Sequence, residues 1–399
     1  MITATLSRPA RRPHLATLVA VTAVPTLATT MFIPSMTSIA RDLSASYATV
    51  QLGLSAFLFV TALVQLVCGP LSDVIGRRPV LLAVMAIYLI GTLLCITAWN
   101  IETFLAGRVL QGASAAGLVL GRTVLRDIYE REKAASMIGY TVMAMAVGPM
   151  LGPWIGGVID GAYGWRGTFW LLGAAGLLTL LALLVDLPET NRTLGRSFGE
   201  QRDAYRSLLR RRGFWVFAAT GSMSSSMFFA FLGGAAQVAD RALGMTPAGY
   251  GAWFAFCAAG YAFGNFLSGR YAERVGLGRM ILAGAALGIA GPLAVTLSAL
   301  VGWLHPFALF GWVAFVGVGN GLVLPSNVAA AISIRPDAAG AASGLLGTIQ
   351  TLVGAAASVV AAVVVGAGEM VLPLALVLLA FGAAALVFAR SAAAIIRPV

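Results

Sequence analysis

The chain has 399 residues, of which 59% are hydrophobic and only 10% are charged. A water-soluble domain usually carries about 25% charged residues, so this composition excludes an ordinary soluble enzyme or binding domain. The net charge of +11 is scattered over short segments without interleaved aromatic residues. That distribution excludes a nucleic-acid interface and favours contact with an anionic membrane leaflet.

Twelve apolar segments follow one another along the chain, each near the roughly 20 residues that a helix needs to cross a bilayer. In chain order they are 15–38, 48–71, 79–98, 102–125, 135–159, 166–187, 213–238, 248–270, 280–301, 307–330, 339–366 and 371–390. Of the 26 basic residues, 22 lie in the tails or in alternate gaps, and only Arg41, Arg166 and Arg241 lie in the other gaps. Because short cytoplasmic loops retain Lys and Arg, this alternation predicts an integral membrane protein with both termini in the cytoplasm.

The longest polar segment, 188–212, separates the predicted spans into two sets of six. A short repeat supports this division, since the glycine, acid and glycine of 69–76 recur in 269–276 at an offset of 200. We therefore expect an all-α fold of two six-helix bundles, a transporter plan in which the halves are related by an axis along the membrane normal. The predicted divisions are a tail 1–14, a first bundle 15–187, a cytoplasmic linker 188–212, a second bundle 213–390 and a tail 391–399. Within the linker, Tyr205, Leu208 and Leu209 lie among arginines, a pattern suited to a short helix on the membrane surface.

The segment 69–79, between the second and third predicted spans, reads Gly-Pro-Leu-Ser-Asp-Val-Ile-Gly-Arg-Arg-Pro. Its glycines allow helix ends to approach closely, and Asp73 can pair with a cytoplasmic arginine and lie near a helix N-terminus. We interpret the segment and its repeat as a conformational latch, with a capped turn and solvated arginines as the alternative. The predicted latch residues are Gly69, Asp73, Gly76, Arg77, Arg78 and Glu273.

Arg108 lies inside the fourth predicted span, where an arginine costs on the order of 2.5–3.5 kcal/mol. It should therefore face a polar interior, and Gln111 and Gly112 share its helix face. Snorkelling toward the outer headgroups is the alternative for this side chain.

The fifth predicted span contains glycines four positions apart, which give a flat face for close helix contact, and prolines that bend the helix. The residues of this motif are Gly148, Pro149, Gly152, Pro153, Gly156 and Gly157. An ordinary tight helix crossing is the alternative interpretation.

These motifs carry a resemblance to a known family. The segment 69–79 resembles the loop signature of the major facilitator superfamily, and the segment around Arg108 resembles its fourth-helix motif, whose arginine is linked to proton transfer. The fifth-span motif resembles that of drug/proton antiporters in the superfamily. Softer similarities at 126–129, 165–169 and 187–190 resemble the bicyclomycin and chloramphenicol resistance group.

One departure from that group concerns proton coupling. The group usually has an aspartate in the first span, and Thr30 occupies that position here. Since no Asp or Glu lies near the middle of any predicted span, we expect either weak coupling or coupling through an outer-end acid such as Asp160 or Asp240. A cavity made positive by Arg108 should accept neutral or anionic amphipaths. The predicted coupling and cavity residues are Arg108, Gln111, Thr30, Met31, Phe32 and Asn320.

Together these features predict a multi-pass transporter of the bacterial inner membrane that exports small drug-like compounds by alternating access, driven by protons and acting as a monomer. A dedicated transporter of one metabolite and a non-transporting membrane sensor are the alternatives. We expect no enzyme activity, because paired catalytic groups are missing. We also expect no cofactor and no metal site, because His14 and His305 are isolated and the three cysteines lie in apolar segments.

Overall fold

The computed structural model describes residues 13–129, 131–191, 198–335, 339–366 and 371–396. In the first part of the chain the helical elements are α1 (Leu15–Thr30), η1 (Ile33–Ser35), α2 (Met36–Asp42), α3 (Tyr47–Ile75), α4 (Arg77–Ile96), α5 (Ile101–Gln111), η2 (Gly112–Ala115), α6 (Ala116–Ile128), α7 (Arg131–Tyr163) and α8 (Trp165–Asp186). They are followed by α9 (Phe198–Leu209), α10 (Arg212–Arg241), α11 (Pro247–Val275), α12 (Leu277–Leu300), η3 (Phe307–Gly311), α13 (Trp312–Ser333), α14 (Ala339–Gly366) and α15 (Val371–Ile396). The prediction of an all-helical chain is confirmed over these residues.

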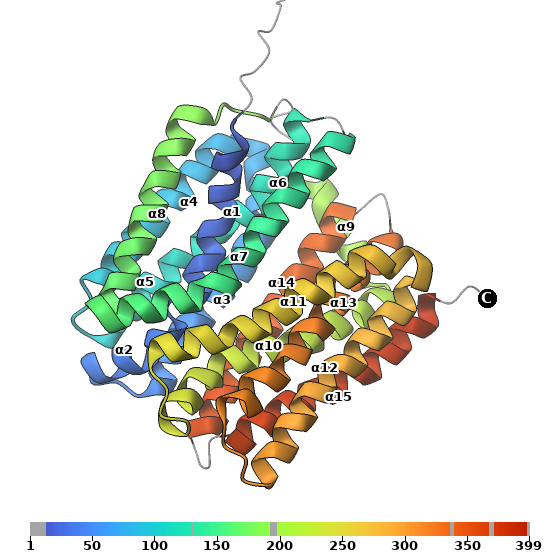
Figure 1. Cartoon of the computed structure of the whole chain (residues 1–399). Coiled ribbons are helices and arrows are strands. Elements are labelled where there is room, and N and C mark those ends of the chain that lie inside the picture. Colours follow the sequence, from blue (N-terminus) through green and yellow to red (C-terminus); the bar gives the residue numbers. More distant parts are fainter. Residues whose placement is uncertain (1–12, 130, 192–197, 336–338, 367–370, 397–399) are drawn as a thin grey trace, which may run out of the picture.

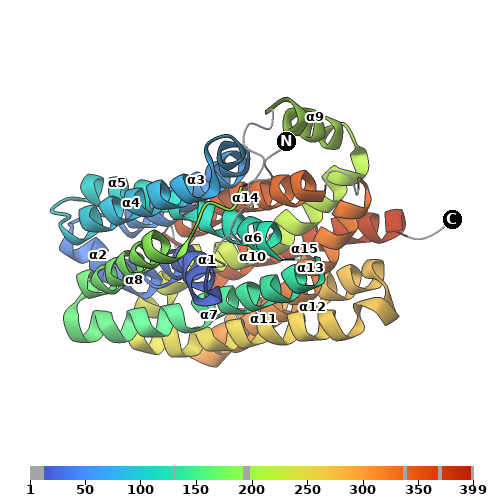
Figure 2. The ribbon, with the colours of Figure 1, turned by 90° about the horizontal axis from the view of Figure 1, so that it is seen from above.

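The helices form two bundles, α1–α8 and α10–α15, which meet along two seams (Figure 1). At one seam α7 packs against α11, and at the other α3 packs against α14. The short helix α9 lies at the edge of the second bundle, near the start of α14, and stands apart from the long helices when the molecule is seen from above (Figure 2). A short helix in the linker was expected from its sequence, and α9 occupies that place.

Ten helical segments among the described residues are long and apolar enough to cross a membrane. α7 and α11, with 33 and 29 residues, occupy the positions of the fifth and eighth predicted spans. Large apolar side chains remain exposed on the outside of the bundles, for example Leu178 (69%) and Val185 (77%) on α8. Contiguous apolar surface of this kind suits a lipid environment, where helices satisfy all of their own backbone groups.

The repeat found in the sequence is also a repeat of backbone structure. α3 and α11 both have 29 residues, and they begin and end 200 positions apart. The side chains of Ser46 and Thr246 cap their N-termini by accepting a hydrogen bond from the backbone three residues later. Both helices end at a glycine with positive φ, +106° at Gly76 and +87° at Gly276, a conformation that glycine adopts without steric cost.

Two predicted spans are interrupted helices. The first, predicted at 15–38, extends to Asp42 and changes to a 3-10 turn at 33–35, where Pro34 has no N–H to continue the α-helix. The fourth, predicted at 102–125, contains the 3-10 segment η2 at 112–115. There Gly112 lies so close to α3 that a Cβ would be 2.7 Å from the Cβ of Val60. Sequence periodicity misses both breaks, and the second results from a contact between helices.

Candidate functional site

Arg108 is fully buried in the first bundle, which contradicts the alternative that its side chain snorkels to the outer headgroups. It donates hydrogen bonds to Gln111 Oε1 (2.6 Å) and to the Gly53 carbonyl (3.4 Å). Its guanidinium carbon lies 4.0 Å from the ring centre of Phe32 and 4.7 Å from that of Phe57. Such contacts with aromatic faces contribute on the order of 2 kcal/mol each when they are desolvated.

No carboxylate pairs with Arg108 within the described part of the chain, and its second terminal nitrogen has no hydrogen-bond partner. Gln111 is itself held in place, because its amide nitrogen donates to Thr92 Oγ1 at 2.8 Å. The site therefore keeps an oriented positive charge among neutral groups, where an unpaired charge is costly unless an anion or a strong acceptor can reach it.

Of the predicted cavity residues in the first span, Thr30 and Met31 contact α7. The hydroxyl of Thr30 donates to the carbonyls of Thr26 (3.1 Å) and Gly148 (3.2 Å). A Cβ at Gly156 would overlap the carbonyl of Met31. Of the first-span candidates, the structure thus places Phe32 directly at Arg108, and it places Thr30 and Met31 at the α1–α7 contact.

The fifth-span motif gives α7 two close contact faces. On one face, a Cβ at Gly148 or at Gly152 would lie 2.6 Å from the hydroxyl of Thr26 or Thr30 on α1. On the other, Gly157 lies against the backbone of Pro247 at the start of α11. Pro153 contributes to the same seam through its carbonyl, which faces Gly251 of α11. The motif therefore packs α7 tightly against α1 of its own bundle and against α11 of the other bundle. The side chain of Pro149 lies outside the described residues.

Asn320 lies in the second bundle, on α13, and is 3% exposed. Its side-chain oxygen accepts a hydrogen bond of 2.6 Å from Ser224 Oγ on α10. A neighbouring helix therefore satisfies this buried amide. In the same bundle, Asn327 Oδ1 and Gln350 Nε2 are buried without a hydrogen-bond partner, and they offer an acceptor and a donor that no protein group uses.

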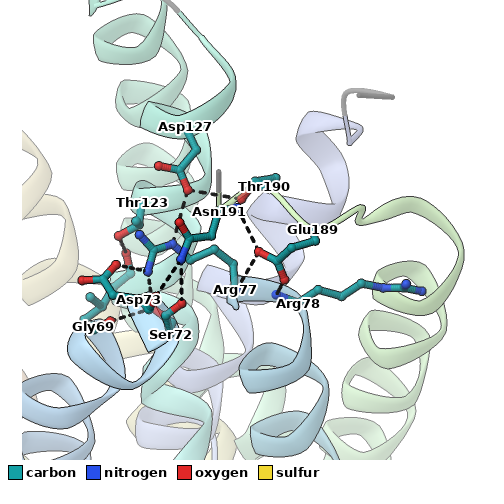
Figure 3. A network of polar contacts seen from close by, with 11 residues as sticks. Gly69, Ser72, Asp73, Arg77, Arg78, Thr123, Asp127, Glu189, Thr190 and Asn191 are labelled. Carbon is teal, nitrogen blue, oxygen red and sulfur yellow. Dashed lines mark hydrogen bonds and ion pairs between the residues drawn. The ribbon is translucent and has the colours of Figure 1, made fainter. Parts of the chain in front are cut away.

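The predicted latch is centred on Arg77 (Figure 3). Its guanidinium forms ion pairs with Asp73 (2.5 Å) and Asp127 (3.3 Å), and it donates to Ser72 Oγ (2.5 Å). The Arg77 side chain is only 8% exposed, so these charge-assisted bonds are shielded from water. The expected pairing of Asp73 with an arginine is present, and the ion pairs of Arg77 join the end of α3 to α4 and α6.

Glu189 takes the role at the helix N-terminus that the sequence assigned to Asp73. Its two carboxylate oxygens accept the backbone N–H groups of Arg77 (2.9 Å) and Arg78 (3.1 Å), at the start of α4. Gly76 has no side chain to obstruct this carboxylate, which a Cβ would overlap. Asp73 does not cap α4, because it lies in the last turn of α3 and its carboxylate pairs with the Arg77 guanidinium instead.

Two neighbours of Glu189 extend the network, and the sequence did not identify them as site residues. Asn191 donates to the carbonyls of Ser72 (3.2 Å) and Asp73 (3.0 Å). The hydroxyl of Thr190 donates to Asp127 at 3.2 Å. The segment after α8 is thus fastened to the α3–α4 turn, and the resemblance at 187–190 was the only sequence signal for it.

None of the remaining latch candidates contributes a side chain to this network of carboxylates. The side chain of Arg78 donates to the Leu184 carbonyl at 2.9 Å. Glu273, the repeat partner of Asp73, is exposed and forms no ion pair among the described residues. Gly69 contributes its carbonyl, which accepts a hydrogen bond of 2.8 Å from Ser72 Oγ.

We predict that Arg77→Ala destabilises the protein by about 2 kcal/mol, because it leaves the partly buried Asp73 and Asp127 without their shared cation. Thermal unfolding of the detergent-purified protein measures this effect. Arg78→Ala is the matched control, because the Arg78 side chain pairs with no carboxylate and its removal should change stability far less. Equal stability losses in the two variants would contradict the assignment.

At the opposite end of the first bundle, the short helix α2 is fixed to two neighbouring helices. Ser38 Oγ donates to Asp160 of α7 at 2.8 Å. Asp42 accepts hydrogen bonds from Trp165 Nε1 (3.0 Å) and from Arg166 (2.6 Å) at the start of α8. Burial raises the pKa of the Asp160 carboxyl, which lies one residue beyond the predicted span 135–159, although Ser38 and Arg41 oppose the shift.

α2 also reaches the second bundle. Arg41 forms an ion pair of 3.0 Å with Asp240 at the end of α10. Beside it, the hydroxyl of Tyr47 donates to the Gly233 carbonyl at 3.2 Å. A cavity of about 500 Å³ opens at this seam. It is lined in part by Thr37, Arg41, Tyr47, Gln237, Asp240 and Arg241.

Two apolar helical bundles, a cation buried inside the first of them and close glycine contacts between them are features of a membrane transporter. The profile of the Major Facilitator Superfamily matches residues 18–358, and the chain belongs to that family. Its members transport solutes across membranes and are not enzymes.

Relatives of known sequence match over most of the chain. An uncharacterized MFS-type transporter of Bacillus subtilis is 31% identical and covers 82% of this chain and 83% of its own length. The multidrug resistance protein D of Escherichia coli is 28% identical and covers 84% of each chain. The bicyclomycin resistance protein homolog of Haemophilus influenzae is also 28% identical, covering 83% of this chain and 84% of its own. These matches confirm the resemblance to the drug-resistance transporters of the superfamily.

The fold is also shared with a solved structure. A bacterial homolog of the human lysosomal transporter Spinster, crystallised in an inward-facing and unoccupied conformation, superposes with a TM-score of 0.70 over 95% of each chain. The sequence identity is 19%, so this match concerns the fold alone.

Proposed function

We propose that this protein exports small neutral or anionic amphipathic compounds from the cytoplasm of a bacterium, in exchange for protons. Twelve spans in two halves, 15–187 and 213–390, would cross the inner membrane with both termini and the linker 188–212 on the cytoplasmic side. The names of the relatives, which concern resistance to several drugs and to bicyclomycin, support a drug-like substrate. A single chain would suffice, because both halves of the transporter plan are present.

The observation that carries this proposal is the unpaired guanidinium of Arg108. It is fully buried and is surrounded by amide, carbonyl and aromatic groups, with no carboxylate paired to it among the described residues. A lipophilic cation approaching this centre would be repelled at low dielectric, whereas an anion or a strong acceptor would be attracted. The substrate preference should therefore follow the sign of charge.

Proton coupling is proposed for the outer end of the molecule. Asp160 combines a raised pKa with a hydrogen bond to Ser38 on α2, and the same helix carries Arg41, which pairs with Asp240 of the other bundle. Protonation of either carboxylate weakens a contact of α2. We infer that proton uptake at these acids loosens the outer seam, which is closed in this structure by Arg41–Asp240 and Tyr47–Gly233.

Transport in inside-out membrane vesicles tests the function. We expect a neutral and an anionic drug to accumulate faster when a pH gradient is imposed, and the cation tetraphenylphosphonium to accumulate poorly. High turnover of tetraphenylphosphonium would contradict the charge preference. A transport rate that does not change with the pH gradient for any of the three compounds would contradict proton exchange.

We predict that Asp160→Asn removes most of the acceleration that a pH gradient gives to export, because asparagine resembles the protonated acid at every pH. The raised pKa of Asp160 means that the wild-type carboxyl takes up its proton at a higher pH than an exposed aspartate does. The slope of the vesicle rate against pH measures the change. Glu102→Gln, at an exposed acid of the same outer end, is the control and should keep the wild-type slope.

A further inference from the structure

Four arginines lie where α9 leads into α10: Arg206, Arg210, Arg211 and Arg212, which we name the linker arginine cluster. All four are exposed. None of them forms an ion pair with a carboxylate among the residues that the structure describes. Positive charges this closely spaced produce a strong local field that attracts an anionic partner.

Two arginines of the cluster, Arg206 and Arg210, line a hollow in the surface. A cavity of about 520 Å³ is lined by Tyr205, Arg206, Leu209 and Arg210, at the C-terminal end of α9. The lining thus combines two arginines with the aromatic residue Tyr205 and with Leu209, whose exposed fraction is 39%. A ligand that fits this hollow has a negative head and an apolar part.

The cavity wall is held in a fixed position against the second bundle. Leu208, on the other face of α9, is fully buried in an apolar cluster with Phe214 and Phe217 of α10. The neighbouring Ser207 accepts a hydrogen bond from Arg335, at the end of α13. A site whose backbone is fixed in this way loses little conformational freedom when it binds a ligand.

The position along the chain places the hollow at headgroup depth. The apolar segment that α10 contributes begins at Arg212, the last residue of the cluster. Trp215, in its first turn, is 48% exposed and donates its ring N–H to the Leu209 carbonyl at 2.8 Å. Tryptophan in this setting is typical of the boundary between hydrocarbon and headgroups. α9 lies at the edge of the bundle rather than between the bundles (Figure 2).

We propose that the linker arginine cluster is a binding site for an anionic phospholipid, with the phosphate held between Arg206 and Arg210 and an acyl chain lying on Tyr205 and Leu209. Guanidinium groups bind phosphate oxygens in a bidentate geometry that ammonium groups do not reproduce. A lipid held there fastens the linker to the membrane surface at the base of α10. This site is separate from Arg108, so it stands whether or not the transport proposal holds.

Lipid retention by the purified full-length protein tests the site. Native mass spectrometry in a non-ionic detergent, with added phosphatidylglycerol, phosphatidylcholine or inorganic phosphate, gives an apparent dissociation constant for each. We expect a strong preference for phosphatidylglycerol, and we expect its binding to weaken by roughly tenfold or more when Arg206, Arg210, Arg211 and Arg212 are replaced together by alanine. These side chains are exposed, so the variant should fold, which size-exclusion chromatography verifies.

Two further variants make the outcome decisive. Replacing Arg270, Arg274, Arg279 and Arg390 by alanine removes the same charge from exposed positions of the same bundle, and it should change the constant less than about twofold. Arg206→Lys with Arg210→Lys keeps the charge but should still weaken binding several-fold, because the bidentate contacts are lost. Equal effects of the two alanine sets, an unchanged lysine variant, or inorganic phosphate binding as tightly as the lipid would each overturn the proposal.

Discussion

Replacing Arg108 with alanine is expected to abolish export of an anionic drug, by at least about a hundredfold in the initial vesicle rate. The substitution removes the buried positive charge, its hydrogen bonds to Gln111 and Gly53, and its stacking on Phe32 and Phe57. A buried ionic contact to a ligand contributes several kcal/mol, and each 1.4 kcal/mol changes a rate or an affinity tenfold. Near-normal export by this variant would contradict the role proposed for the guanidinium.

A companion variant separates the loss of charge from the loss of packing. Arg108→Lys keeps the charge but cannot donate simultaneously to Gln111 and Gly53 in the same planar geometry. We expect it to retain a measurable part of the anion rate while alanine retains none. Binding of a fluorescent anionic drug to the purified variants, measured beside their thermal unfolding, shows whether the site or the fold has been lost.

Gly157→Val is expected to stop transport of every substrate, whatever its charge. Gly157 lies against the backbone of Pro247, and the nitrogen of Ala248 would be 2.8 Å from a Cβ placed there. A valine must therefore push α7 away from the first turn of α11, and overpacking of this kind costs typically 1–3 kcal/mol. Because that contact forms part of the α7–α11 seam between the bundles, the bundles should stay apart at this end.

Spin labels on the outer rim measure the separation. Trp99 follows α4 and Val301 follows α12, one in each bundle, and both are highly exposed at 75% and 78%. The three native cysteines are buried, so they should label poorly. Gly161→Val is the matched control, since a Cβ at Gly161, one turn further along α7, meets nothing within 4 Å. A Gly157→Val protein with wild-type distances and transport would refute the importance of this seam.

The sequence was sufficient for features that depend on composition and local pattern. Apolar lengths predicted the long helices, and the repeat predicted equivalent hairpins, because a glycine with positive φ ends both α3 and α11. The sequence also indicated Arg108 as a site residue, since a lone cation in an apolar span requires polar groups around it. Each of these signals can be read from one short stretch of sequence or from the comparison of two such stretches.

Most of the features that sequence reasoning missed depend on contacts between distant segments. Glu189 caps α4 from 112 positions away, so no local sequence pattern could indicate that Glu189, rather than Asp73, accepts the N–H groups of that helix end. The burial of Arg108 between two aromatic rings depends on the change to a 3-10 turn after Phe32, which positions that ring. Likewise, the ion pair of Arg41 with Asp240 spans 199 positions and exists only because the two bundles meet at that end.

The short helix α2 gathers contacts to α7, α8 and α10 within seven residues. In the proposed orientation α2 lies at the outer face of the inner membrane, beside a cavity of about 500 Å³ that is lined in part by Arg41 and Asp240. A nanobody or macrocycle bound across those two side chains would hold the two bundles together without occupying the substrate pathway. Inhibition from that position should not be relieved by raising the drug concentration, and it would not require the inhibitor to cross the inner membrane.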